Sequence, residues 1–196
     1  MHLRAHLRAI NALPTSSTTK QVLKTMTSKS SGIAAFDAVV ALGSNIGDKF
    51  ANMNRAIEIL VRRGDITLIG RSRDFKTPPW GKTDQDWFAN AVITIATDLT
   101  PRQLLDRCQS VEQEMGRVHV EKWGPRLIDL DILTFGDTNI AEADFTVPHP
   151  HLTERAFVLA PMADVAPDVV VKGKRVADWL RDVDVTGVDA VAPVST

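Results

Sequence analysis

The sequence predicts an α+β fold in which two helices lie on one face of a mostly antiparallel sheet. The main observation is the order of the segments. Stretches rich in β-branched residues and stretches of helical periodicity follow one another as strand, helix, strand, strand, helix, strand. The second observation is size and composition, since 196 residues with 44% hydrophobic and 24% charged residues are enough for one domain with its own core.

The first half of this order runs to a long loop. Residues 37–45 begin with an apolar run and predict a buried strand. Residues 46–64 predict an amphipathic helix, because Asp48 can cap its start and its apolar residues recur every three or four positions. Residues 65–77 alternate and predict the second strand, and the Pro, Gly and Asp content of 78–86 predicts a loop.

The second half begins with a third strand at 87–99, where Val and Ile favour extended structure. Thr100 caps the next helix, which ends at Gly116. Residues 117–126 predict a second long polar loop, and 127–136 predict the fourth strand. The order β-α-β-β-α-β is the split βαβ, or ferredoxin-like, arrangement. With helices on one face only, the other face of the sheet and its long loops are free to bind a ligand, so we expect the active site there.

Only short elements are predicted beyond the fourth strand. We expect a short helix over 158–168, broken at Pro161, and a last one within 171–183. The predicted domain covers residues 37–182, and 183–196 form a C-terminal tail.

The first 36 residues are rich in Ser and Thr and contain no Asp or Glu. This composition is typical of a flexible N-terminal extension, or of a start upstream of the true initiator, for which Met26 is the candidate. It also occurs in organelle transit peptides, so we expect a cytoplasmic protein, with an organelle as the alternative.

The overall composition excludes several classes of partner. The net charge of −1 provides no basic field for nucleic acid or an anionic membrane, and no apolar run approaches the length of a membrane-spanning helix. Cys108 is the only cysteine, which excludes an intramolecular disulfide.

The fourth strand carries two charges inside an apolar run, "LIDLDIL" at 127–133. Because side chains alternate along a strand, Ile128, Leu130 and Ile132 should face the helices, and the other face carries Leu127, Asp129, Asp131 and Leu133. The Cα atoms of the two aspartates are expected to lie roughly 6.5–7 Å apart. Their carboxylates are hard oxygen ligands, which suit a pair of Mg²⁺ ions that also bind phosphates. The alternative is a solvated strand face whose aspartates pair with nearby Lys or Arg.

Cations stand just before this pair, at Arg117, Lys122 and Arg126. Arginine forks and Mg²⁺ both neutralise charge on phosphoryl oxygens, so the segment indicates a polyphosphate site. The sequence has no Walker A loop and no protein-kinase motifs, so ATP would bind without them. A zinc site is not predicted, because the single cysteine is distant from His149 and His151 in the sequence.

Aromatic residues lie in or beside the two loops, at Trp80, Trp87, Phe88 and Trp123. Taken singly, each of these aromatic residues more commonly packs in the core or at its edge than binds a ligand. Together with Asn90, whose amide can donate and accept hydrogen bonds, they indicate a flat heterocycle that is stacked and recognised at its edge.

The chain resembles the 6-hydroxymethyl-7,8-dihydropterin pyrophosphokinases of folate biosynthesis over roughly residues 38–170. The resemblance rests on "ALGSNIGD", "KTPPWG", "WFANAV", "VEQEMGRV", "WGPRLIDLDIL" and "VPHPHLTERAFVLAP", which occur in this order. It implies transfer of pyrophosphate from ATP, the co-substrate, to the hydroxymethyl group of the pterin, with release of AMP. It also implies two Mg²⁺ ions. We expect small-molecule partners only, with no nucleic-acid or membrane partner, and a monomer.

The resemblance also implies roles for individual residues. Asp129 and Asp131 would hold the metal ions, and Arg117 and Arg126 would be the catalytic clamp on the phosphates. The pterin site would comprise Thr77, Pro78, Trp80, Phe88, Asn90, Trp123 and Phe157. The ATP site would comprise Glu112, Arg117, Arg126, Thr146, His149 and Arg155.

Two positions depart from the family pattern at the nucleotide site. Pro150 stands where a relative has a phosphate-contacting tyrosine, and Asp144 stands where it has an arginine. Two other functions remain to be separated from the enzyme. A noncatalytic binding module would need no aspartate pair, and a ferredoxin-like RNA-binding domain would need a basic sheet face.

Overall fold

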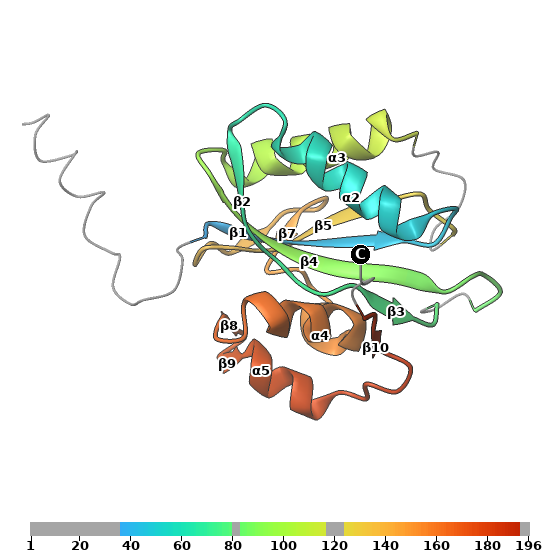
Figure 1. Cartoon of the computed structure of the whole chain (residues 1–196). Helices are drawn as coiled ribbons and strands as arrows, with labels where there is room; N and C mark the ends of the chain where they lie inside the picture. The colour runs from blue at the N-terminus through green and yellow to red at the C-terminus, as the bar shows by residue number, and fades with distance from the viewer. Residues whose placement is uncertain (1–35, 80–82, 117–123, 193–196) are drawn as a thin grey trace, which may run out of the picture. The chain divides into compact units, whose positions relative to one another are not determined.

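The computed structural model describes residues 36–79, 83–116 and 124–192 (Figure 1). Contacts divide the chain into residues 1–35 and 36–196, and every described residue belongs to the second unit. The predicted N-terminal extension therefore lies, except for Phe36, outside the described residues.

One antiparallel sheet forms the centre of this unit. Its strand order is β10-β3-β4-β1-β5, and β2 pairs with β4 beside β3. The strands are β1 (Ala38–Ser44), β2 (Ile66–Arg71), β3 (Phe75–Thr77), β4 (Phe88–Thr97), β5 (Asp129–Phe135) and β10 (Asp189–Ala190). Two small hairpins stand apart from it, β6 (Ile140–Ala141) with β7 (Thr146–Val147) and β8 (Val170–Val171) with β9 (Lys174–Arg175).

The two predicted long helices are α2 (Lys49–Val61) and α3 (Pro101–Glu114). Asp48 caps α2, its carboxylate accepting the Ala51 N–H. Thr100 caps α3 in a capping box with Gln103. Both starts were readable because the cap residue directly precedes the apolar periodicity.

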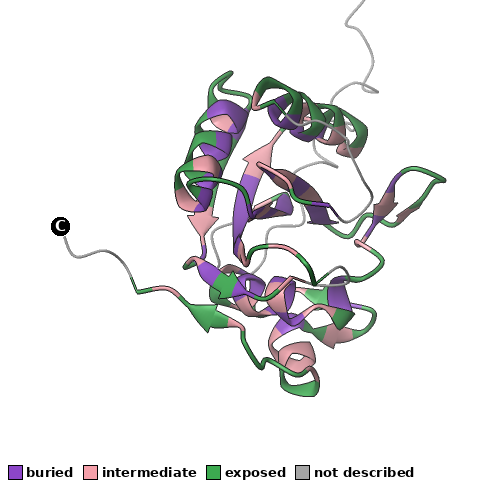
Figure 2. Ribbon diagram, turned by 90° about the vertical axis from the view of Figure 1, so that its right-hand side faces the viewer, coloured by how far each residue is buried: buried purple, intermediate pink, exposed green. Residues whose placement is uncertain are grey.

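The helices lie on both faces of the sheet, α2 and α3 on one and α4 (Ala156–Val165) and α5 (Val176–Trp179) on the other (Figure 1). Buried residues concentrate on the strands and the inward sides of the helices (Figure 2). Alternation along the strands separates two cores. Ala38, Val40 and Leu42 of β1 join the core with α2 and α3, and Val39 joins the core with α4.

The predicted fold class is confirmed: the sheet is antiparallel, and α2 and α3, the helices of the βαββαβ order, share one face. The C-terminal segment adds a layer that covers part of the opposite face. It comprises η1 (Leu152–Glu154), α4, α5 and η2 (Leu180–Asp182). No helix among the described residues is long and apolar enough to cross a membrane.

Three details differ from the predictions. The strand predicted at 65–77 is two strands, because residues 72–74 leave the ladder of β2 and are held by side chains. The Ser72 hydroxyl accepts the Val92 N–H at 2.9 Å, and Arg73 pairs with Asp164 of α4 at 2.8 Å. The break is thus set by contacts with residues far away in the sequence.

The helix predicted over 158–168 begins at Ala156 and runs unbroken through Pro161. Proline removes one intrahelical hydrogen bond, but Leu159 and Met162 are fully buried against β1 and β4, so packing keeps the helix continuous. Strand β10, which pairs with β3, lies within the 183–196 segment that we predicted as a tail.

Candidate active site

Three neighbouring strands place Asp129, Gly43 and Asn90 in one row across the sheet. Gly43 pairs with Asp129 of β5 on one side and with Asn90 of β4 on the other. A Cβ atom on Gly43 would lie 3.3 Å from Asn90 Oδ1. Because Gly43 has no side chain, the Asn90 amide oxygen can lie close above it, on the face opposite α2 and α3, and we call this surface between Asp129 and Asn90 the floor of the site.

Asp131 follows Asp129 by two residues on β5, so it lies on the same face, and it pairs with Ala41 of β1. Leu130 and Ile132 are buried in the core with α2 and α3, so the predicted alternation of β5 is confirmed and both aspartates face the other way. Both carboxylates are partly exposed. Arg126 Nη1 donates to Asp129 Oδ2 at 2.6 Å, which places a guanidinium directly beside the pair.

The aspartate pair fits Mg²⁺ better than a metal bound by protein alone. The described residues contain no group of three His, Cys, Asp or Glu side chains that could hold a metal ion. Mg²⁺ usually takes one or two carboxylates and completes its shell with water and substrate phosphates. Two carboxylates beside arginines are therefore the donor set expected for Mg²⁺ bound together with a polyphosphate.

The predicted pterin residues of β3 and β4 lie together. Asn90 Nδ2 donates to Thr77 Oγ1 at 2.7 Å, and both side chains are buried. Phe88 shares the face of Asn90, and the Arg126 guanidinium lies 5.6 Å from its ring centroid. Pro78 directly follows β3 and is exposed. An amide, a hydroxyl and an aromatic face are thus presented beside the aspartates.

Phe157 and Arg155 come from the start of α4. The Arg155 guanidinium lies 5.7 Å from the Phe157 ring centroid. Burial lowers the pKa of Arg155, and the charges of Asp131 and Asp129 act in the opposite direction. The arginine is therefore electrostatically coupled to both proposed metal ligands.

His149 is held as a neutral ring. Its backbone N–H donates to Leu133 O at 2.9 Å, and its Nδ1 accepts the His151 N–H at 3.2 Å. Burial, helped by the positive charge of Arg155, lowers the pKa of His149 to about 4. With Nδ1 used as an acceptor, the ring proton lies on Nε2, where it can be donated to a ligand.

The remaining predicted ATP residues flank β5. Glu112 of α3 is buried, and its Oε1 accepts the Leu130 N–H at 2.7 Å, so it supports the strand between the two aspartates. Thr146 pairs with Ala141 in the β6–β7 hairpin. Asp144, one of the departures, is an ion-pair partner of Arg102 at 2.9 Å.

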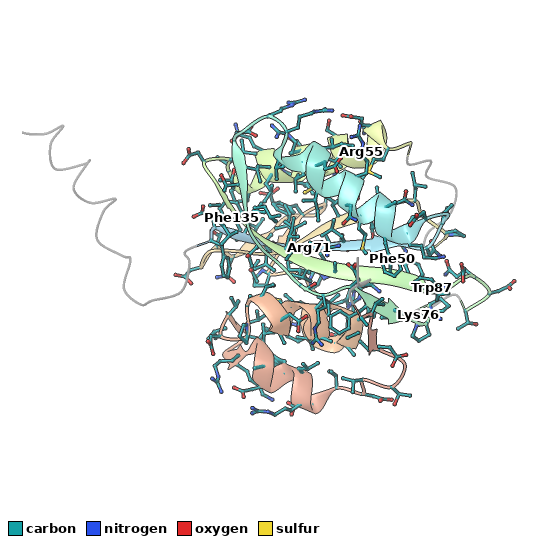
Figure 3. All side chains as sticks on the ribbon, in the orientation of Figure 1. Phe50, Arg55, Arg71, Lys76, Trp87 and Phe135 are labelled. Carbon is teal, nitrogen blue, oxygen red and sulfur yellow. The ribbon has the colours of Figure 1, made fainter. Side chains whose placement is uncertain are left out.

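Three predicted site residues, Trp80, Arg117 and Trp123, lie outside the described residues. Trp87, expected among the ring-stacking aromatics, packs 5.9 Å from Phe50 between centroids, and Lys49 Nζ lies 4.2 Å from its ring centroid (Figure 3). Lys49 is also paired with Asp86 at 2.7 Å. These contacts are those of an aromatic packed at the base of a loop.

Sequence reasoning did not single out Gly43 of the site or Asn45 beside it. Gly43 was readable in principle, because a glycine inside a strand often marks close approach of another group. Asn45 hydrogen-bonds Gln85 and the Arg126 N–H and carries no such signal, since these partners lie 40 and 81 positions away.

Comparisons with known proteins show the family of this chain. The family model described as 7,8-dihydro-6-hydroxymethylpterin-pyrophosphokinase (HPPK) matches residues 39–167. The chain belongs to this family. Its relatives include the 2-amino-4-hydroxy-6-hydroxymethyldihydropteridine pyrophosphokinase of Methylorubrum extorquens, 46% identical over 79% of this chain and 98% of that protein. The Bacillus subtilis protein of the same name is 42% identical over 67% of this chain and 79% of its own length.

Solved structures support the fold. Plasmodium falciparum HPPK-DHPS with pteroate matches with a TM-score of 0.60 at 15% identity, over 79% of this chain. A second HPPK-DHPS structure, in complex with substrates, gives 0.61 at 12% identity over 76% of this chain. This chain spans 43% of each of those longer proteins, and at such identity the likeness concerns the fold alone.

Proposed function

We propose which residues of this chain carry out the reaction of its family. As a family member it is a pyrophosphokinase, which transfers pyrophosphate to hydroxymethyldihydropterin in folate biosynthesis, with ATP as co-substrate. The observation that carries the residue assignment is the row of Asp129, Gly43 and Asn90. In this proposal Asp129 binds metal and Asn90 recognises the pterin ring, and the two substrates meet over Gly43, which lies between them.

In this proposal Asp129 and Asp131 hold two Mg²⁺ ions together with ATP oxygens. Bound Mg²⁺ neutralises phosphate charge and orients the phosphates. Arg126 and Arg117 clamp the same phosphates, and the charge of Arg155 adds to theirs. His149 donates from Nε2 to a phosphate oxygen while it stays neutral. Glu112 and Thr146 complete the nucleotide side, Glu112 by holding β5.

The pterin lies on the other side of the floor. Asn90 and Thr77 recognise its edge, and Phe88 and Phe157 contact its ring. The resemblance adds Pro78, Trp80 and Trp123 to this pocket. The hydroxymethyl oxygen attacks the β-phosphorus of ATP, the bond from that phosphorus to the α-phosphate bridging oxygen breaks, AMP leaves with that oxygen, and the hydroxyl proton is lost to water. Positioning and charge neutralisation accomplish this without a side-chain nucleophile.

We assign the chain as a monomeric cytoplasmic enzyme with small-molecule substrates and no nucleic-acid or membrane partner. Size-exclusion chromatography with light scattering tests the oligomeric state.

One experiment separates this enzyme from a noncatalytic binding module. The purified chain is incubated with ATP, Mg²⁺ and 6-hydroxymethyl-7,8-dihydropterin, and AMP and the pterin diphosphate are measured by chromatography. We expect equal amounts of both products, and neither when the pterin is omitted or EDTA is added. Binding of both substrates without product would favour the binding module.

A further inference from the structure

A buried carboxamide just beyond the end of β1 connects two segments that flank the site. Asn45 is 4% exposed. Its Oδ1 accepts the Arg126 N–H at 2.7 Å, and its own backbone N–H donates to Arg126 O at 3.1 Å. Its Nδ2 donates to Gln85 Oε1 at 3.0 Å. The three hydrogen bonds join residues that are far apart in the sequence.

The orientation of this carboxamide is fixed by its partners. A backbone N–H can only donate, so the Asn45 oxygen must face Arg126 and the nitrogen must face Gln85. A leucine could fill the space but would leave the Arg126 N–H without this acceptor. Asparagine is therefore matched to both neighbours, which a role in packing alone would not require.

The consequence falls on Arg126. Both polar groups of its main chain are bonded to Asn45, which sets where its side chain begins. From there the guanidinium bonds Asp129 at 2.6 Å and lies 5.6 Å from the Phe88 ring centroid. Small displacements of a group that contacts reacting atoms can lower a rate by orders of magnitude.

We propose that Asn45 is a positioning residue for the reaction. It holds the Arg126 main chain so that the guanidinium stands over the aspartate pair, and it ties Arg126 to Gln85 on the opposite segment. This inference rests on the proposed role of Arg126 as a phosphate clamp. Asn45 itself acts through Arg126.

The test compares Asn45→Ala with a matched asparagine variant. Asn52 of α2 donates to Ser44 Oγ at 3.3 Å and to Ile46 O at 2.9 Å, and neither partner belongs to the proposed site. The values of kcat, KM for both substrates and Kd for ATP are measured for Asn45→Ala and Asn52→Ala. Each variant is made in the wild-type and in the Arg126→Ala background.

We expect Asn45→Ala to lower kcat by at least about fivefold while the Kd for ATP changes less than about threefold. Asn52→Ala should stay within about twofold of wild type. In the Arg126→Ala background, Asn45→Ala should lower kcat by less than about twofold, because its target is gone. A smaller loss in the wild-type background, or an equal loss in both backgrounds, overturns the proposal.

Gln85→Ala provides a second variant if Asn45→Ala does not fold. It removes one partner of the same carboxamide without emptying a buried position. The proposal then requires a kcat loss of at least about twofold that disappears in the Arg126→Ala background, and an unchanged kcat overturns it. If the wild-type chain formed no AMP, the proposed function would fail and the role of Asn45 with it. An active wild type with unaffected variants would remove only the role of Asn45.

Discussion

Replacing Gly43 by alanine should impair pterin binding while leaving the protein folded. The added Cβ would lie 3.3 Å from Asn90 Oδ1, so the amide must move by a few tenths of an ångström. That movement disturbs the 2.7 Å bond to Thr77 and fills the floor of the site. Losing one hydrogen bond and some contact area costs about 1–2 kcal/mol, which corresponds to a roughly 5- to 30-fold higher Kd for the pterin.

Gly70→Ala is the matched control, because it adds a methyl group to the same sheet face away from the site. There the Cβ would lie 2.9 Å from Oγ1 of the buried Thr94, which is a closer clash than the one at Gly43. We expect Gly70→Ala to lower the free energy of unfolding by about 1–3 kcal/mol with pterin binding unchanged. Gly43→Ala should be nearly neutral in stability, since alanine also restricts the unfolded chain. Pterin fluorescence titration and urea unfolding measure the two effects, and equal loss of pterin binding in both variants would refute the reasoning.

Three further changes test the site. Asp131→Ala should lower kcat about 100- to 1000-fold, while the Kd for the pterin stays within about twofold of wild type. Asp137→Ala, on an exposed turn, should change neither value. Near-normal turnover in Asp131→Ala would contradict the assignment of Asp131 as a metal ligand. Arg126→Ala should lower kcat far more than it raises the Kd for ATP, and equal changes would make it a simple binding residue. Burial lowers the pKa of His149 to about 4 from 6.5, so the unfolded state binds more protons between these values and stability is lost as the pH drops from 6.5 to 4. The urea midpoint of His149→Gln should therefore drop less than that of wild type from pH 7 to 4.5. Parallel plots of midpoint against pH for the two proteins would count against this. His151→Gln, a change at the exposed neighbouring histidine, is the comparison.

The sequence alone could predict the parts whose signals are local. Alternation in 127–133 separated the two faces of β5 because each face carries one kind of residue, and the buried Leu130 and Ile132 agree with it. The caps of α2 and α3 were readable from Asp48 and Thr100. The fold class followed from the order of these segments.

Other features depend on contacts between distant residues and were not readable. The break at 72–74 is held by Asp164, which lies 91 positions from Arg73. Pro161 predicts a broken helix, but burial of the surrounding face overrides that local preference. The hydrogen bonds of Asn45 exist only once β1, the 85–87 segment and Arg126 are brought together by the fold.

Strand β4 pairs with β1 along one side and with both β2 and β3 along the other. All three partners impose one register on its ten residues. Loss or gain of a single residue just after Asn90 would turn Phe88 and Asn90 toward the core with α2 and α3 and carry apolar side chains into the site. The strand can therefore accept many substitutions but no change in length, and in a library of single-residue insertions and deletions we expect this segment to be the least tolerant of the sheet.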